Sequence, residues 1–275
     1  MQPAPALHTR GVSEEEQPAS PWNDTPSRLR KALKQDEFVL FCQPILALRG
    51  NGGFALAEVL IRLREEEQAL LPPGEFLPLF EQHEMMPLLD RWVLVRIVQR
   101  IAAGCRVARL AMNVSGQTLL DAEFPGFFAE TVKRSKIPPA AVVFEVDERD
   151  LVGRPQAVKR FAERVRGTGG GLAVSGFGRR LDSFDALEAL RPDFVKVDGS
   201  ITLKILKSTT SEGLLKAVLR VGASLRMGVI AECVEEQDVL LRLGALGVGY
   251  AQGFGVATPR PLEHLSPRFK AADAA

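Results

Sequence analysis

The sequence predicts an α/β fold, a barrel of the (β/α)₈ type, and two observations carry the prediction. From about Ser27 onward, amphipathic stretches of helical length alternate with short apolar runs, which is typical of βα units around a parallel sheet. The chain has 275 residues, of which 46% are hydrophobic and 25% charged, enough for one such barrel. We therefore expect one barrel domain over residues 27–275. Residues 1–26, rich in Pro, Ala and Glu, are expected to form a disordered leader or linker.

Helices are expected where apolar residues recur at helical spacing. Leu88, Trp92, Val95 and Val98 show this spacing in one of them. The expected helices cover 28–35 (capped by Ser27), 87–103, 155–166, 212–225 and 235–243. The glycine-rich run 167–171 follows a helix and precedes a strand, so we interpret it as a helix C-cap and turn, not a phosphate-binding loop.

The expected strands share one feature, a polar residue at the C-terminal end. Apolar runs end in this way at Asn113, Glu145, Ser175, Lys196, Glu232 and Gln252. Two earlier strands, 38–43 and 54–61, bring Gln43, Glu58 and Arg62 to the same region. Barrel enzymes carry their chemistry at the C-terminal ends of the strands, so the pattern predicts a functional site there.

Composition excludes several classes of function. Thirty-five basic against 34 acidic residues leave a net charge of +1, so no overall field favours a nucleic acid polymer or an anionic membrane. The three cysteines, Cys42, Cys105 and Cys233, include no CxxC pair, which disfavours zinc and disulfide scaffolds and favours a reducing, cytoplasmic setting. No apolar run is long enough to predict membrane insertion.

The order of motifs resembles the EAL domain family over roughly residues 38–265. The motifs are Gln43-Pro44-Ile45, Glu58-Val59-Leu60-Ile61-Arg62, Met112-Asn113-Val114-Ser115, Phe144-Glu145-Val146-Asp147-Glu148, Phe177-Gly178, Val195-Lys196-Val197-Asp198, Ala231-Glu232-Cys233-Val234-Glu235 and Gln252-Gly253-Phe254. The resemblance implies a TIM-like barrel with one antiparallel strand, and hydrolysis of cyclic di-GMP with Mg²⁺ or Mn²⁺.

Site roles follow from the resemblance residue by residue. It implies metal ligation by Glu58, Asn113 and Glu145. Lys196 and Glu232 match catalytic positions, Lys196 that of the lysine that orients or activates the attacking water. Gln43, Leu60, Arg62 and Gln252 match ligand-facing positions, with Arg62 suited to a phosphate group.

One motif departs from the family. The family's Asp-Asp-Phe-Gly is here Ser175-Gly176-Phe177-Gly178. A hydroxyl is a poor ligand for Mg²⁺ and glycine offers none, so we expect Lys196 and Glu232 to be vestigial and hydrolysis to be low or absent. No cofactor is then required, although one Mg²⁺ or Mn²⁺ on Glu58, Asn113 and Glu145 remains conceivable.

The next loop also differs, with Arg179-Arg180-Leu181-Asp182-Ser183 in place of Thr-Gly-Tyr-Ser-Ser. Arg179 and Arg180 are either a solvated surface pair or a source of positive charge beside an anionic ligand. Cys233 replaces a glycine and is expected to be an inert buried thiol, with a redox-sensitive one as the alternative.

Three functions remain open from the sequence. The first is a cyclic di-GMP receptor that signals to a protein partner, by resemblance an adjoining GGDEF-type domain or a PilZ-type adaptor, with a homodimer as a further option. The second is an interaction domain that no longer binds the nucleotide. The third is a weakly active phosphodiesterase with an altered metal arrangement.

Overall fold

The computed structural model describes residues 25–50, 53–64, 70–104, 107–180 and 182–264. Most of the expected leader lies outside these residues, as do Cys105, Leu181 and the last 11 residues of the expected domain. No helix in the described part of the chain is both long and apolar enough to cross a bilayer.

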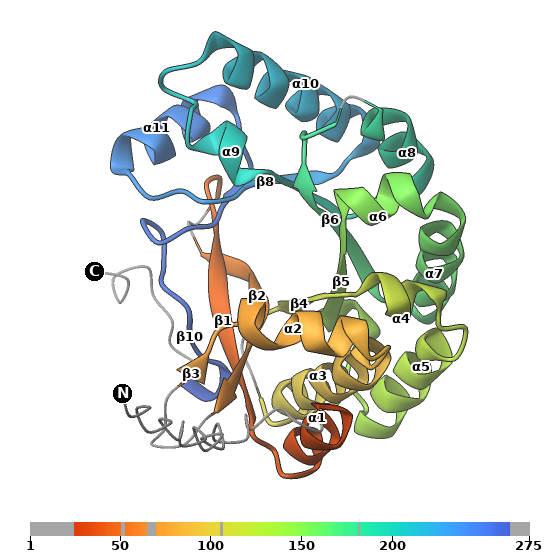
Figure 1. Cartoon of the computed structure of the whole chain (residues 1–275). Helices are drawn as coiled ribbons and strands as arrows, with labels where there is room; N and C mark the ends of the chain where they lie inside the picture. Colours follow the sequence, from red (N-terminus) through yellow and green to blue (C-terminus); the bar gives the residue numbers. More distant parts are fainter. Residues whose placement is uncertain (1–24, 51–52, 65–69, 105–106, 181, 265–275) are drawn as a thin grey trace, which may run out of the picture.

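Eight strands close into a barrel with helices around the outside, as Figure 1 shows. In order around the barrel they are β1 (Phe38–Ala47), β9 (Tyr250–Ala251), β8 (Gly228–Ala231), β7 (Phe194–Val197), β6 (Gly171–Phe177), β5 (Val142–Asp147), β4 (Arg109–Asn113) and β2 (Phe54–Arg64). Strand β1 is antiparallel to both of its barrel neighbours, and the pairs from β2 through β4 to β9 are parallel. The predicted TIM-like barrel with one antiparallel strand is confirmed. Two short strands, β3 (Leu70–Leu71) and β10 (Arg260–Pro261), extend the sheet beyond the barrel.

The helices cover the outer face of the strands (Figure 1). They are α1 (Thr25–Lys34), α2 (Pro73–Gln82), α3 (Met86–Ala102), α4 (Gly116–Leu120), α5 (Phe124–Ser135), α6 (Glu148–Gly153), α7 (Pro155–Thr168), α8 (Ser183–Leu190), α9 (Gly199–Thr202), α10 (Thr209–Leu225) and α11 (Gln237–Leu246), with 3₁₀ turns at Pro139–Ala141 and Leu262–His264. The five predicted helices are present as α1, α3, α7, α10 and α11. The predicted cap was wrong, because α1 begins at Thr25 and includes Ser27. The predicted C-cap is confirmed, since Gly169, directly after α7, adopts the left-handed conformation and caps the helix.

The barrel interior explains why the strand ends are polar. One apolar cluster takes a single residue from each of seven strands: Ile45, Leu56, Ala111, Val143, Ala173, Phe194 and Ile230. Residues i and i+2 of a strand share a face, so the residue two positions nearer the rim also faces the interior, in a second layer. This residue follows the apolar one in the parallel strands and precedes it in antiparallel β1. That second layer consists of Gln43, Glu58, Asn113, Glu145, Ser175, Lys196 and Glu232.

Candidate functional site

Lys196 lies at the centre of the polar layer. Its Nζ is 2.7 Å from Glu58 Oε2, 2.9 Å from Glu145 Oε2 and 3.1 Å from Glu232 Oε1. The Lys196 side chain is only 1% exposed and that of Glu145 is not exposed at all. Strands β2, β5, β7 and β8 thus bring the candidate catalytic and metal-ligating residues together, as the sequence predicted.

This arrangement changes the acidity of each group. Burial alone would lower the pKa of Lys196, but the three carboxylates hold it well above its ordinary value. Burial would raise the pKa of Glu58, yet the Lys196 ammonium and hydrogen bonds from Gln252 and Asn113 bring it below the usual value. Burial raises the pKa of Glu145 to about 8, helped by the charge of Glu58, and burial also raises that of Glu232. Burial therefore makes the carboxyl group of Glu145 easier to protonate than that of an ordinary glutamate.

Amide side chains complete the inner network. Gln252 Nε2 donates to Glu58 Oε2 at 2.7 Å and to Gln43 Oε1 at 3.1 Å. Gln43 Nε2 donates to the carbonyl of Ala257 at 3.1 Å. Asn113 Nδ2 donates to Glu58 Oε1 at 2.8 Å. Both oxygens of Glu58 are therefore already engaged by protein donors.

Leu60 and Arg62 continue the row of Glu58 toward the rim of β2. Leu60 lines a pocket of about 320 Å³ together with Asn113, Glu145 and Ser175. Arg62 lies beyond it, with its guanidinium carbon 5.7 Å from the centre of the Phe41 ring and Nη1 donating to the carbonyl of Ile61 at 2.8 Å. A second pocket of about 300 Å³ is lined by Gln43, Glu58, Glu232 and Gln252 among others. The Lys196 cluster contributes residues to both.

The end of β6 carries no carboxylate. In the β5–β6 register Ser175 lies opposite Asp147. The register between β6 and β7 shifts between Val174 and Phe177, which marks a bulge in β6. Within this bulge Gly176 has φ +61°, a left-handed conformation that favours glycine. Positions 175 and 176 thus present a hydroxyl and a bare backbone.

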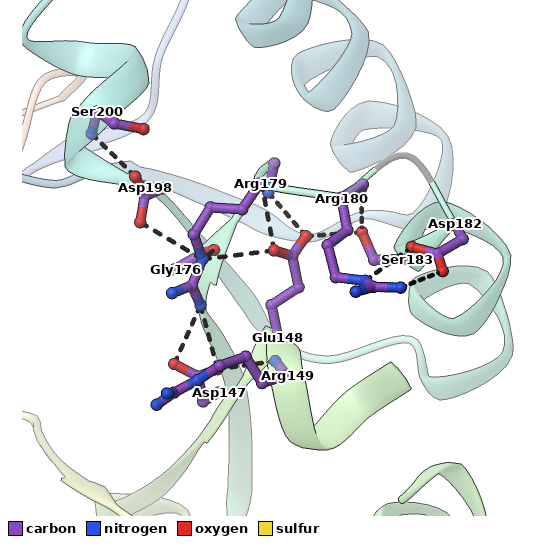
Figure 2. A network of polar contacts seen from close by, with 11 residues as sticks. Asp147, Glu148, Arg149, Gly176, Arg179, Arg180, Asp182, Ser183, Asp198 and Ser200 are labelled. Carbon is purple, nitrogen blue, oxygen red and sulfur yellow. Dashed lines mark hydrogen bonds and ion pairs between the residues drawn. The ribbon is translucent and has the colours of Figure 1, made fainter. Parts of the chain in front are cut away.

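Arg179 and Arg180 point in different directions (Figure 2). The guanidinium of Arg179 turns inward to Asp147, with Nη2 3.1 Å from both carboxylate oxygens. Arg180 pairs instead with Asp182 at 2.6 Å in a contact where both side chains are more than half exposed. Arg179 and Arg180 therefore do not form one solvated surface pair. That either arginine contacts an anionic ligand stays a prediction.

Buried Glu148 anchors the loop that carries these arginines. Its carboxylate accepts hydrogen bonds from the backbone amides of Gly178 and Arg179, at 2.9 and 3.2 Å, and from Ser183 Oγ at 2.7 Å (Figure 2). Glu148 belongs to the motif that begins at Phe144, but it was not predicted as a site residue. Its place directly after a strand end was the available indication.

Cys233 is exposed, so the expected buried thiol was wrong. It has φ +55°, which explains why a glycine suits this position. Partial burial and the neighbouring carboxylates of Glu232 and Asp198 raise its pKa. Because the thiolate is the reactive form, this disfavours the redox-sensitive alternative.

The donor set does not fit a pair of divalent metal ions. Glu58 is engaged at both oxygens, Asn113 turns its amide nitrogen toward Glu58, and positions 175 and 176 offer no carboxylate. In the network around Lys196, Glu145 Oε1 and Gln252 Oε1 are buried oxygens without a hydrogen-bond partner, and these two atoms favour a single ion. Among the described residues, no group of three or more His, Cys, Asp or Glu side chains is arranged to hold a metal ion.

Comparison with known proteins identifies relatives over most of the chain. The model of the EAL domain matches residues 27–259. Cyclic di-GMP phosphodiesterase PdeF of Escherichia coli (strain K12) is 27% identical over 239 residues, which cover 86% of this chain and 32% of that protein. Cyclic di-GMP phosphodiesterase RocR of Pseudomonas aeruginosa is 29% identical over 241 residues, 86% of this chain and 60% of that protein.

Solved structures agree with this match. The EAL domain of FimX from Pseudomonas aeruginosa, bound to c-di-GMP, superimposes with a TM-score of 0.83 at 27% identity, covering 90% of this chain and all of that one. The PaMucR phosphodiesterase in its c-di-GMP complex gives a TM-score of 0.81 at 26% identity, with 88% and 100% covered. The chain spans about a third of the length of the first curated relatives it matches.

Proposed function

The chain belongs to the EAL domain family, and from this premise we propose that it is a cyclic di-GMP receptor that holds the nucleotide with little or no hydrolysis. One observation carries the proposal: the end of β6 offers Ser175 and Gly176 where a two-metal phosphodiesterase needs carboxylates. Attack on a phosphodiester requires an activated water and neutralisation of the phosphoryl oxygens, which two metal ions together supply. Binding does not require either ion.

The ligand is held by the residues that lead from Lys196 to the rim. Gln43 and Gln252 present amide groups for polar contacts, and Leu60 lines the larger pocket. Arg62 offers a guanidinium at the rim, with the planar donor geometry that suits a phosphate. Two pockets, each lined in part by a glutamate that contacts Lys196, suit a two-lobed dinucleotide better than a compact metabolite.

The charge of the inner cluster permits an anion without metal. Lys196 offsets one carboxylate, and the raised pKa of Glu145 makes a second carboxyl group easier to protonate than an ordinary glutamate. The cluster therefore carries less negative charge than its three glutamates suggest. A single Mg²⁺ or Mn²⁺ on Glu58, Asn113 and Glu145 would have to compete with the Lys196 ammonium, so it is dispensable in this proposal.

A second candidate is a weakly active phosphodiesterase. It is favoured by the survival of Lys196 beside Glu58, Glu145 and Glu232, with Asn113 on the same network. The partner that receives the signal, such as an adjoining GGDEF-type domain or a PilZ-type adaptor, belongs to the proposal as well.

Titration with cyclic di-GMP, followed by chromatography of the same samples, separates the candidates. Saturable binding with the nucleotide recovered intact supports the receptor. Recovery of linear dinucleotide in Mn²⁺ supports the phosphodiesterase and contradicts the receptor. No binding at high nucleotide concentration contradicts both and leaves a protein-interaction domain.

A further inference from the structure

The guanidinium of Arg179 lies among three carboxylates at the rim of the barrel (Figure 2). Nη2 is 3.1 Å from both oxygens of Asp147, and Nε is 3.5 Å from Glu148 Oε2 and 3.6 Å from Asp198 Oδ2. Nε also donates to the carbonyl of Gly176 at 2.7 Å. Asp147 ends β5 and Glu148 comes directly after it, Asp198 follows β7, and Arg179 follows β6, the strand between them. One cation thus bridges acidic groups from both neighbouring strands.

Arg179 is the cation that these three carboxylates share, and Asp147 has a further ion pair with the exposed Arg149 at 2.9 Å. The side chain of Glu148 is 1% exposed, that of Asp198 20% and that of Asp147 28%. Like charges this close and this shielded from water repel one another unless an opposite charge lies between them. Arginine suits the position because its planar fork can serve several carboxylates at once.

Gly176 provides the space that the guanidinium fills. A Cβ at position 176 would lie 2.8 Å from Arg179 Cζ and closer still to Nη2. The guanidinium cannot simply swing aside, because the move would release Asp147 and the carbonyl of Gly176. A side chain at position 176 and the present position of Arg179 therefore exclude each other.

We propose that Arg179 is an internal cation that replaces divalent metal ions in neutralising this side of the site, and that Gly176 and Arg179 together keep the site metal-independent. This deepens the receptor function proposed above and rests on it in one respect, that the site works without metal. It follows that aspartates restored at positions 175 and 176 do not rebuild a metal site while Arg179 is present. Removal of Arg179 lets them do so.

Calorimetric titration with Mn²⁺ alone tests the proposal on variants of the full chain. The set comprises the native chain, Ser175→Asp/Gly176→Asp, the same pair with Arg179→Thr, and the same pair with Arg180→Thr. Arg180→Thr is the matched control, because Arg180 is adjacent in sequence but pairs with exposed Asp182. We expect the variant that combines Arg179→Thr with the two aspartates to bind Mn²⁺ at least about tenfold more tightly than any other chain in the set. A rise in Tm with Mn²⁺ is expected for that variant alone.

Equal Mn²⁺ affinity with and without Arg179, or no binding in any variant, overturns the proposal. Should the triple variant fail to fold, urea unfolding of Arg179→Gln against Arg180→Gln decides instead. Arg179→Gln must lower the midpoint and Arg180→Gln must leave it near the native value; equal midpoints overturn the proposal. No nucleotide enters these experiments, so a failure of cyclic di-GMP binding, which would contradict the receptor function, is a separate result.

Discussion

The ammonium of Lys196 and the carboxylate of Glu145 form a 2.9 Å ion pair in which neither side chain is more than 1% exposed. Glu58 and Glu232 share the same ammonium. One ammonium therefore offsets part of the charge of the three glutamates, and this protein cation is the physical basis for expecting a site that functions without metal ions. The pair also has consequences for stability.

Lys196→Met should destabilise the fold by about 3–5 kcal/mol, because it leaves three carboxylates without their cation in a buried site. The measurement is urea unfolding at neutral pH. The penalty should shrink at mildly acidic pH, where the unpaired carboxyl groups take up protons instead. Lys204→Met, at an exposed position, is the control and should change little. A Lys196→Met protein as stable as the native chain would contradict this account.

Asp90 should make stability depend on pH between about 4 and 6. Burial raises its pKa from 3.8 to about 6, although its carboxylate accepts hydrogen bonds from Ser115 N and Oγ at 3.1 and 2.9 Å. The folded protein therefore holds this proton more tightly than the unfolded chain. The ionisation penalty is absent below pH 3.8, grows as the pH rises to about 6 and is constant above it, reaching at most about 3 kcal/mol.

Asp90→Asn removes the charge and keeps an acceptor for Ser115. Relative to the native chain it should gain stability as the pH rises from 4 to 6, measured by urea unfolding at a series of pH values. Asp90→Ala should be less stable than Asp90→Asn throughout, because it leaves the Ser115 amide without its acceptor. Parallel pH profiles for the native chain and Asp90→Asn would refute the raised pKa.

Arg62→Ala should weaken cyclic di-GMP binding by about 1.5–3 kcal/mol if its guanidinium holds a phosphate, since hydrogen bonds to charged groups contribute that much. Arg64→Ala, a change of the same residue type two positions along β2, should leave the affinity unchanged. Calorimetry on the three proteins checks both expectations. Equal losses for the two variants would remove Arg62 from the binding site.

Gly253→Ala should disturb Gln252, because a Cβ at this position would lie 2.6 Å from the carbonyl carbon of Val234 and closer to other atoms of the same backbone. The hydrogen bond from Val234 N to the Gln252 carbonyl, now 3.0 Å, would have to lengthen. We expect a loss of roughly 1–3 kcal/mol in thermal or urea unfolding, together with weaker nucleotide binding.

Gly244→Ala is the matched control for Gly253→Ala. Gly244 lies within α11 and has open space around it, so alanine there should stabilise the helix by about 0.5–1 kcal/mol. Equal effects of the two substitutions would show that the close approach at Gly253 carries no energetic weight.

Much of the fold could be predicted from the sequence because barrel strands are short apolar runs with a regular ending. The interior residues Ala111 and Phe194 are followed two positions later by Asn113 and Lys196, and the other parallel strands repeat this step. Short helices were harder to predict. α6 and α9 depend on single capping side chains, Asp147 and Asp198, more than on an apolar stripe of their own.

The candidate site could be predicted only in part, because strand ends follow from the topology and loop contacts do not. Residues at the ends of strands converge by topology, so the strand pattern alone was enough to place Lys196 and its glutamates together. The contacts of Arg179 depend on the conformation of a loop and on the space left by Gly176, which no pattern in the sequence encodes. The order β5–β6–β7 was the one available indication that Arg179 would meet Asp147 and Asp198.

The most direct test of the central claim is the ratio of two dissociation constants. Cyclic di-GMP is titrated calorimetrically into the native chain once in EDTA and once in Mn²⁺, with the nucleotide checked by chromatography after each run. The account predicts the same dissociation constant in both, within about a factor of two, and intact nucleotide. Binding that appears only in Mn²⁺, or conversion to the linear dinucleotide, would contradict a receptor whose charges are balanced by Lys196 and Arg179.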